Sequence, residues 1–162
     1  CWNHLRGGGL IVGADWPEAD SDVSAFDVER RLVDTLREDV RQIVDVAGID
    51  DPGAITVAIA PAWRYEAHAL ARAADPGDAV VGPILDAVDG PTSALRAYAE
   101  ALDRRRKELR PTLSQTDERD LLAAASWLLE DEIDAAVTVT VAETGSDLAD
   151  AAEPGKPAIQ ID

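Results

Sequence analysis

The stretch ITVAIAPAWRY, residues 55–65, decides the fold class of this chain. Isoleucine and valine occupy every second position from Ile55 to Ile59, a spacing that is typical of a β-strand with one buried face. Pro61 follows closely, and proline is favoured in the first turn of a helix because its missing N–H needs no partner there. The stretch therefore predicts a strand over residues 55–60 that passes directly into a helix.

Two more strands are predicted near the other end of the sequence. Valine alternates with threonine over residues 136–142, and isoleucine alternates with polar residues over residues 158–162. The acidic, turn-rich segment 143–157 between them predicts a loop. This pattern predicts an α+β domain with a short three-stranded sheet and about four helices between the first two strands. We expect one helix to start at Pro61 and the others to cover residues 79–88, 93–109 and 114–129.

A longer helix is expected ahead of this domain, over residues 23–47. Apolar residues recur there every three or four positions and line one face, while arginines and acids occupy the rest. The segment 48–53 contains two glycines and a proline, and it predicts the end of the helix and a turn. We place a domain boundary in this turn, between residues 1–49 and residues 50–162.

The chain is strongly acidic, with 32 aspartate and glutamate residues against 15 lysine and arginine residues and a net charge of −17. Only Lys107 and Lys156 are lysines, and all other basic residues are arginine. The acids are spread along the whole sequence, which favours adaptation to very high salt over an acidic tail. Charges are screened within about 3 Å at 1 M salt. Net negative charge therefore does not exclude a nucleic-acid partner under such conditions.

Composition also limits the class of protein. Cys1 is the only cysteine, so no internal disulfide can form and no cysteine zinc site is expected. The sequence has no apolar run of about 18 residues and no secretory leader, so we expect a cytoplasmic protein without a membrane partner. It does not begin with methionine and contains none, which favours a fragment of a longer protein.

Residues that carry chemistry are sparse. His4 and His68 are the two histidines, and neither has a second histidine or a cysteine at metal-ligand spacing. No serine stands in the context of a nucleophile elbow. The triple glycine of residues 7–9 lacks the preceding strand and the lysine that a phosphate-binding loop requires. We therefore expect no catalytic residue, no metal site and no cofactor site in this chain.

One basic cluster stands out, at Arg104, Arg105, Arg106, Lys107 and Arg110. On the helix predicted over residues 93–109, two pairs of these cations would share a face. Such a patch could contact phosphates, and arginine can do so with two hydrogen bonds at once. Equally, neighbouring acids could neutralise the cluster, which would then only balance the surrounding charge. The residues alone leave both interpretations open.

Four further stretches are informative when taken in order: Asp15-Trp16-Pro17, residues 36–43 (LREDVRQI), residues 59–65 (IAPAWRY) and residues 156–162 (KPAIQID). Together they resemble archaeal leucyl-tRNA synthetases. The Ala-Pro-x-Trp-x-Tyr pattern and the Lys-Pro-Ala-Ile ending are together the most specific of these motifs. The resemblance covers nearly the whole chain and is looser between residues 75 and 129.

The resemblance implies that residues 1–49 are the end of an α-helical anticodon-binding bundle and residues 50–162 a C-terminal tRNA-binding domain. The partners implied are the elbow and long variable arm of leucine tRNA and the remainder of the synthetase. The family joins leucine to its tRNA with ATP and Mg²⁺, in catalytic and editing domains that have no counterpart here. The candidate tRNA contacts are then the basic cluster together with Lys156, Ile161 and Asp162, where Asp162 would accept hydrogen bonds from base amino groups. Equally, a terminal strand with Pro-Ala-Ile would serve the packing of a sheet edge, so both interpretations of Ile161 and Asp162 stay open.

A different class of function stays open beside this one. The chain could be a free-standing protein-interaction or RNA-binding module without enzymatic activity, with Trp63, Tyr65 and Trp127 as anchors on an apolar surface. The simpler interpretation of these three aromatic residues is that they belong to the core.

Overall fold

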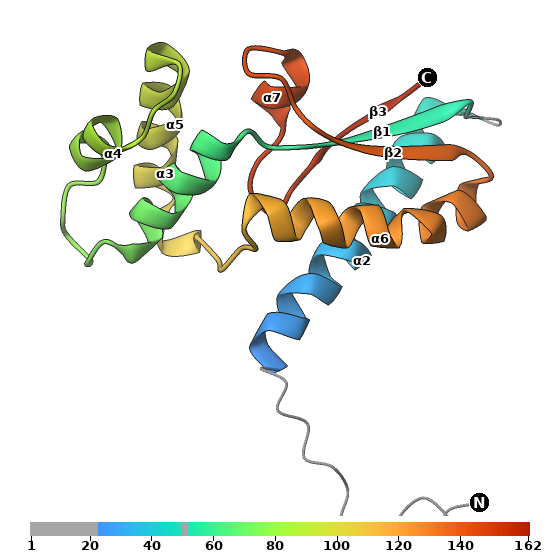
Figure 1. Ribbon diagram of the computed structural model, residues 1–162, viewed down its shortest axis with the longest axis horizontal. Coiled ribbons are helices and arrows are strands. Elements are labelled where there is room, and N and C mark those ends of the chain that lie inside the picture. Colours follow the sequence, from blue (N-terminus) through green and yellow to red (C-terminus); the bar gives the residue numbers. More distant parts are fainter. Residues whose placement is uncertain (1–22, 50–51) are drawn as a thin grey trace, which may run out of the picture.

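The computed structural model describes residues 23–49 and 52–162 (Figure 1). The expected features around residues 1–17 lie outside the described residues. The described part of the chain contains six α-helices, a short 3-10 helix and a three-stranded sheet. In chain order these are α2 (Val23–Ala47), β1 (Ala54–Ile59), α3 (Ala62–Ala73), α4 (Val81–Ala87), α5 (Thr92–Arg104), η2 (Arg106–Glu108), α6 (Gln115–Ile133), β2 (Ala136–Val141), α7 (Asp147–Ala151) and β3 (Ala158–Ile161).

The sheet has the strand order β2-β1-β3, so the strand that opens the fold lies in the centre. β1 pairs in parallel with β2 and antiparallel with β3, and Ile55 stands opposite both Val137 and Ile161. A parallel pair needs a long connection, which helices α3 to α6 supply here. The α+β class predicted from the sequence is therefore confirmed, with four helices between the first two strands.

The two faces of the sheet are covered differently. Ile55, Val57 and Ile59 are fully buried on one face, against residues of α2 and α6 such as Leu36 and Leu122. On the opposite face the side chains are small, and alanines of β1 and β3 pack against alanines of α7 and the segments beside it. The small side chains on this second face thus allow α7 to approach the sheet closely.

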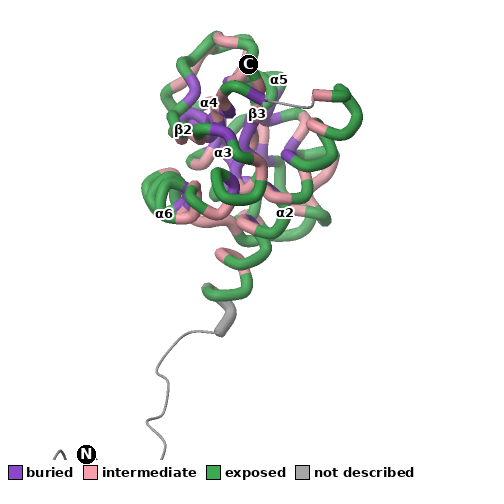
Figure 2. Tube along the Cα trace, turned by 90° about the vertical axis from the view of Figure 1, so that its right-hand side faces the viewer, coloured by how far each residue is buried: buried purple, intermediate pink, exposed green. Residues whose placement is uncertain are grey.

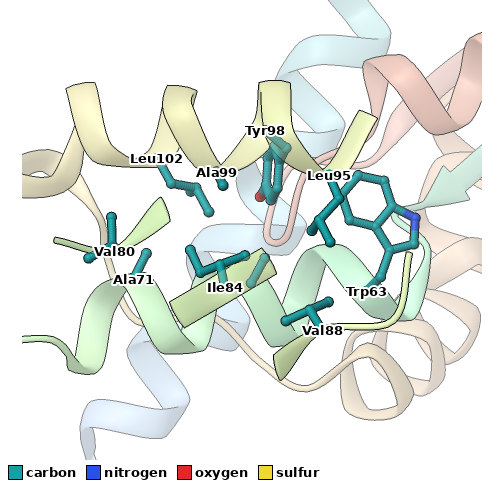
Figure 3. Packing of buried hydrophobic residues seen from close by; sticks show 10 residues of the cluster. Trp63, Ala71, Val80, Ile84, Val88, Leu95, Tyr98, Ala99 and Leu102 are labelled. Atoms are coloured by element: carbon teal, nitrogen blue, oxygen red, sulfur yellow. The ribbon is translucent and has the colours of Figure 1, made fainter. Parts of the chain in front are cut away.

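Helices α3, α4 and α5 form a second apolar cluster beside the sheet (Figure 3). The ring of Trp63 meets the ring of Tyr98 edge to face, with centroids 5.6 Å apart. Gly90 lies against the Trp63 side chain, where a Cβ atom would come within 3.2 Å of the indole. Ile84 and Leu102 fill the rest of the cluster and are fully buried. The position of Trp63 therefore depends on a glycine from the α4–α5 turn.

Helix α2 packs against the sheet and α6 through Leu32, Leu36 and Val40. Arg37 and Arg41 on α2 both form ion pairs with Glu132 on α6, and Arg37 Nε lies 3.0 Å from the carboxylate. The N-terminal turns of α2 extend away from these contacts and are largely exposed (Figure 2). The division into domains after residue 49 stays a prediction.

Three boundaries differ from the sequence-based expectations. Helix α5 ends at Arg104 rather than near residue 109, because Arg105 leaves the helical conformation (φ −104°, ψ 18°). Helix α6 continues to Ile133, where Asp134 ends it in the left-handed conformation (φ 57°). The expected loop 143–157 contains α7, whose start is capped by the Ser146 hydroxyl accepting a hydrogen bond from the Ala149 amide.

The helical cluster should be the part most sensitive to loss of apolar volume. We expect Leu102→Ala to lower the free energy of unfolding by about 2–5 kcal/mol, because the side chain is fully buried and leaves a cavity. Leu70→Ala is the matched control, since Leu70 is 39% exposed in α3. Urea unfolding of both variants in the same salt measures the difference. Equal losses for the two variants would contradict the packing described here.

Candidate nucleic-acid interface

The basic segment, residues 104–110, begins where α5 ends and passes through η2 towards Pro111. Its turn is held by the Glu108 amide, which donates to the Arg105 carbonyl at 2.9 Å. The cations therefore do not lie on one continuous helix. The expectation that pairs of them share a helical face is wrong, because α5 ends at Arg104.

Two cations of the basic segment are committed to contacts within the protein. Arg105 pairs with Glu153 at 2.7 Å. Arg106 donates to the backbone carbonyl of Asp78 at 2.7 Å and to that of Asp75. The first contact ties the segment to the loop after α7, and the second ties it to the turn after α3. Both side chains are partly buried as a result.

The other three cations, Arg104, Lys107 and Arg110, are exposed. None of them forms an ion pair or a side-chain hydrogen bond with another residue that the structure describes. They border two hollows. The α3–α5 hollow, about 910 Å³, lies between the end of α3, the turn after it and residues 103–108. The α2 hollow, about 280 Å³, lies between α2, residues 108–113 and residues 153–155.

Two further arginines reach these hollows from other elements. Arg72 stands in the last turn of α3 and lines the α3–α5 hollow. Arg31 on α2 lines the α2 hollow together with Arg105 and Arg110. Sequence reasoning missed both as site residues. Arg72 has no basic residue within three positions, and Arg31 has only Arg30 beside it, so neither belongs to a basic cluster in the sequence. Only the packing of α3 on α5, and of α2 beside the basic segment, brings them there.

Lys156 is placed near the basic segment by a tight turn. Glu153 and Lys156 form an isolated antiparallel bridge, with backbone hydrogen bonds of 2.8 and 2.9 Å. Since Glu153 is the partner of Arg105, the turn that carries Lys156 is held against that segment. The Lys156 side chain is exposed. The structure therefore groups Lys156 with the basic segment.

Ile161 and Asp162 lie elsewhere. Ile161 pairs with Ile55 and belongs to the apolar cluster shared with α2 and α6. The Asp162 amide donates to the Ala54 carbonyl at 3.0 Å, and the exposed Asp162 carboxylate accepts from the Gln160 side chain at 3.0 Å. These contacts place Asp162 at the start of β1, whereas Lys156 precedes the other end of β3 (Figure 1). The candidate residues thus form two groups at opposite ends of a strand.

A buried arginine supports the loop that carries Glu153. The Arg64 guanidinium lies 5.0 Å from the Trp63 ring centroid and 4.8 Å from that of Tyr98. It donates to the Ala152 carbonyl at 2.8 Å and lies 3.8 Å from the Asp150 carboxylate. The side chain is 8% exposed, so these contacts are largely shielded from water. Arg64 therefore joins the helical cluster to the end of α7.

Glu118 supports the same loop from α6. It is fully buried, and its carboxylate accepts a hydrogen bond of 2.9 Å from the Gly155 amide. Burial raises the pKa of the Glu118 carboxyl group, and the Gly155 amide opposes that change. The pKa of the neighbouring Tyr65 hydroxyl is raised as well, first by burial and then by the Glu118 charge. No cation pairs with Glu118 among the residues described, so its ionised form is disfavoured.

His68 is buried at the edge of the α2 hollow. Burial lowers the pKa of its imidazole, and the positive charges of Arg105 and Arg72 lower it further, whereas Glu153 acts in the opposite direction. The neutral imidazole is therefore favoured. Over the residues that the structure describes, no group of three histidine, cysteine, aspartate or glutamate residues is placed to hold a metal ion. No helix within the described ranges is long and apolar enough to cross a membrane.

The three aromatic residues considered as anchors divide into two kinds. Trp63 is buried in the helical cluster, and Tyr65 is partly buried beside the alanine-rich face of the sheet. Trp127 is 60% exposed, so its assignment to the core is wrong. It points outwards because Leu122 and Leu129 already occupy the inner face of α6. Of the three residues, Trp127 alone could meet a partner.

Comparison with known proteins gives a consistent result. The chain is 42% identical to a leucine–tRNA ligase of Halobacterium salinarum over 173 aligned positions, which cover all of this chain and 18% of that protein. It is 29% identical to a leucine–tRNA ligase of Aeropyrum pernix, in an alignment that covers 98% of this chain and 17% of that protein. No family model matches the chain.

The chain is thus homologous over its whole length to a region of archaeal leucine–tRNA ligases. It spans less than a fifth of the relatives that it matches. The resemblance inferred from the four sequence stretches is confirmed to this extent.

Glu118 should make the stability of the protein depend on pH. The pKa of Glu118 is higher in the folded protein than in the unfolded chain. The contribution of protonated Glu118 to the free energy of unfolding is therefore complete at acid pH, and it is lost as the pH rises through the folded pKa. Glu118→Gln keeps an oxygen acceptor for the Gly155 amide and removes the charge. We expect this variant to be more stable than the parent at about pH 8, and the two to converge near pH 4.

Urea unfolding across this pH range measures the difference between the two proteins. Glu100→Gln serves as the control, because Glu100 is an exposed glutamate on α5. A Glu118→Gln variant that is less stable than the parent at every pH would contradict the raised pKa of Glu118 in the folded protein.

Proposed function

We propose that this chain is the C-terminal, tRNA-binding portion of a leucyl-tRNA synthetase. The observation that carries the proposal is the homology of the whole chain to a region of proteins named leucine–tRNA ligases. The exposed cations of the basic segment support it, because they gather at one place in a chain with a net charge of −17. Phosphate groups are the most general ligand for such a cluster.

On this proposal the chain contributes position rather than chemistry. The enzyme attaches leucine to tRNA with ATP and Mg²⁺ in the more than four-fifths of its length that this chain does not cover. Holding the body of the tRNA lets the acceptor end reach that distant site in a productive orientation. Residues 1–49 would belong to the anticodon-binding bundle, and residues 50–162 would reach the elbow and the long variable arm of leucine tRNA.

The two groups of candidate residues suit different parts of an RNA. The basic segment and Lys156 offer cations, which contact phosphates without regard to base sequence. Asp162 offers a carboxylate, which can accept hydrogen bonds from the amino groups of unpaired bases in an arm. Ile161 is mostly engaged in the apolar cluster, and its role would be to place Asp162. Affinity and discrimination would thus arise at opposite ends of β3.

The rest of the synthetase is a second partner under this proposal. Phe26 and Val46 on α2 are 65% and 82% exposed, and Trp127 on α6 is 60% exposed. Apolar side chains of this size on two neighbouring helices are suited to contact with another part of the same enzyme. The alternative of a free-standing interaction module would use the same residues. The exposure of Trp127 supports that alternative as much as it supports contact with the rest of the synthetase.

Binding of leucine tRNA by the 162-residue chain tests the proposed function. We expect the chain to bind leucine tRNA and to lose affinity when the variable arm is shortened, because the candidate base contact lies in that arm. An unrelated tRNA is the control for general phosphate binding. Equal affinity for all three RNAs, or none, would contradict the proposal.

Asp162→Ala tests the base-reading group separately. This substitution should reduce the difference in affinity between the full and the shortened arm, because it removes the carboxylate and leaves the backbone pairing with Ala54 in place. Glu143→Ala is a control, since Glu143 is an exposed acid that lies outside β3. A loss of discrimination with both variants would point to net charge rather than to Asp162.

The charge of the chain leads to a proposal about its working conditions. With 32 acids and 15 basic residues, repulsion between acids opposes the compact state at low salt and is screened at high salt. We expect the helical circular-dichroism signal to rise between about 0.1 M and 2 M potassium chloride. A chain that is fully folded at the low end of this series would contradict adaptation to high salt.

A further inference from the structure

The α3–α5 hollow is more strongly cationic than the α2 hollow. Five of its lining residues carry a positive charge and three carry a negative charge, in a chain where acids outnumber bases two to one. Arg72 stands in the last turn of α3 and Arg104 in the last turn of α5. Arg105 follows α5 directly, and Arg106 and Lys107 belong to η2. A local excess of positive charge on such an acidic surface needs a physical reason.

Contacts within the protein account for only two of the five cations. Arg105 pairs with Glu153, and Arg106 donates to two backbone carbonyls of the turn that follows α3. Arg72, Arg104 and Lys107 are exposed and form no ion pair with any residue that the structure describes. Three cations of the hollow are therefore available to a ligand.

The hollow is also held in shape. Arg106 bridges η2 to the turn at residues 75–78, so the two rims of the recess are fastened to each other. Beneath it, Ala71 and Leu102 are fully buried between α3 and α5 and keep the two helix ends adjacent. Arg72 and Arg104 thus project from rigid elements whose separation is set by the core.

We propose that the α3–α5 hollow binds a phosphate group of an RNA backbone, with Arg72, Arg104 and Lys107 as its ligands. This inference rests on the proposed function and names the place where the tRNA backbone is held. Arginine offers a planar fork of donors that matches two phosphate oxygens, and lysine adds a point charge. At molar salt these groups would act by direct contact with the phosphate, because charges are screened within about 3 Å at 1 M salt.

A purely structural reading of the same residues exists. Arg72 and Arg104 stand in the last turns of their helices, where a positive charge interacts favourably with the helix dipole. That interaction affects folding stability and does not depend on RNA. The number of phosphates that the protein neutralises, by contrast, appears in the salt dependence of binding. The salt dependence therefore separates the two readings.

The test uses the full 162-residue chain and its variants Arg72→Ala, Arg104→Ala and Lys107→Ala. Association constants are measured with leucine tRNA and with an RNA duplex of unrelated sequence, over a salt series in which circular dichroism shows folded protein. Each substitution should reduce the slope of log K against log salt by about one unit, for both RNAs. Over a fourfold range of salt, the fall in the association constant would then be smaller by a factor of roughly three to four for each cation removed.

Two controls are matched to these variants. Arg96→Ala removes the same charge from an exposed position on α5 that lies outside the hollow, and it should leave the slope unchanged. Arg72→Lys keeps the charge and should keep most of the slope. If an alanine variant failed to fold, the lysine variant and Lys107→Ala would still report on the hollow.

The outcomes separate this inference from the proposed function. Unchanged slopes in all three alanine variants would overturn the phosphate site, even if shortening the variable arm still weakened binding and so supported the proposed function. Reduced slopes without any preference for leucine tRNA would support the site and contradict the proposed function. Absence of binding to either RNA would overturn both.

An acidic polypeptide is the other ligand that such a recess could take. Polyglutamate serves as the probe for it, under the same salt conditions and with the same variants. Loss of polyglutamate binding in the alanine variants, together with unchanged RNA slopes, would assign the hollow to an acidic protein partner and overturn the proposal.

Discussion

The buried guanidinium of Arg64 is the contact on which the arrangement of this chain depends. It lies about equally close to the rings of Trp63 and Tyr98, and it donates to the carbonyl of Ala152. A cation removed from water in this way needs partners, since an unpaired buried charge is strongly destabilising. Its partners belong to α3, α5 and the end of α7. One side chain thus links the helical cluster to the end of α7.

The loop after α7 shows the consequence. Its composition suggests an irregular acidic segment, yet three separate elements hold it: Arg64 of α3, Glu118 of α6 and Arg105 after α5. Each contact gives a partner to a polar group that is at least partly buried. Because β3 follows directly, the same contacts place that strand beside β1. The loop is therefore part of the framework that presents both groups of candidate RNA contacts.

The charges of the protein are distributed in a way that suits binding of an anion at one face. Acidic residues are spread along the whole chain, and three exposed cations from α3, α5 and η2 meet at the α3–α5 hollow. Arg106 holds the two rims together and Arg105 pairs with Glu153, which leaves Arg72, Arg104 and Lys107 to act on a ligand. A recess built in this manner costs little reorganisation on binding, because the positions of its cations are already set by the core.

The sequence by itself determined the elements and the family. Alternation of apolar residues indicated all three strands, and periodic apolar faces indicated the described helices except α7, which lies in a segment predicted to be a loop. Four short stretches indicated the archaeal leucyl-tRNA synthetases to which the chain is homologous. These are local properties, read from spacing along the chain. Only the tertiary structure decided where α5 stops, that Arg105 turns to Glu153 and that Arg72 joins Arg104 and Lys107. The reason is physical: such pairings join residues far apart in sequence, and packing between helices, not local propensity, brings them together.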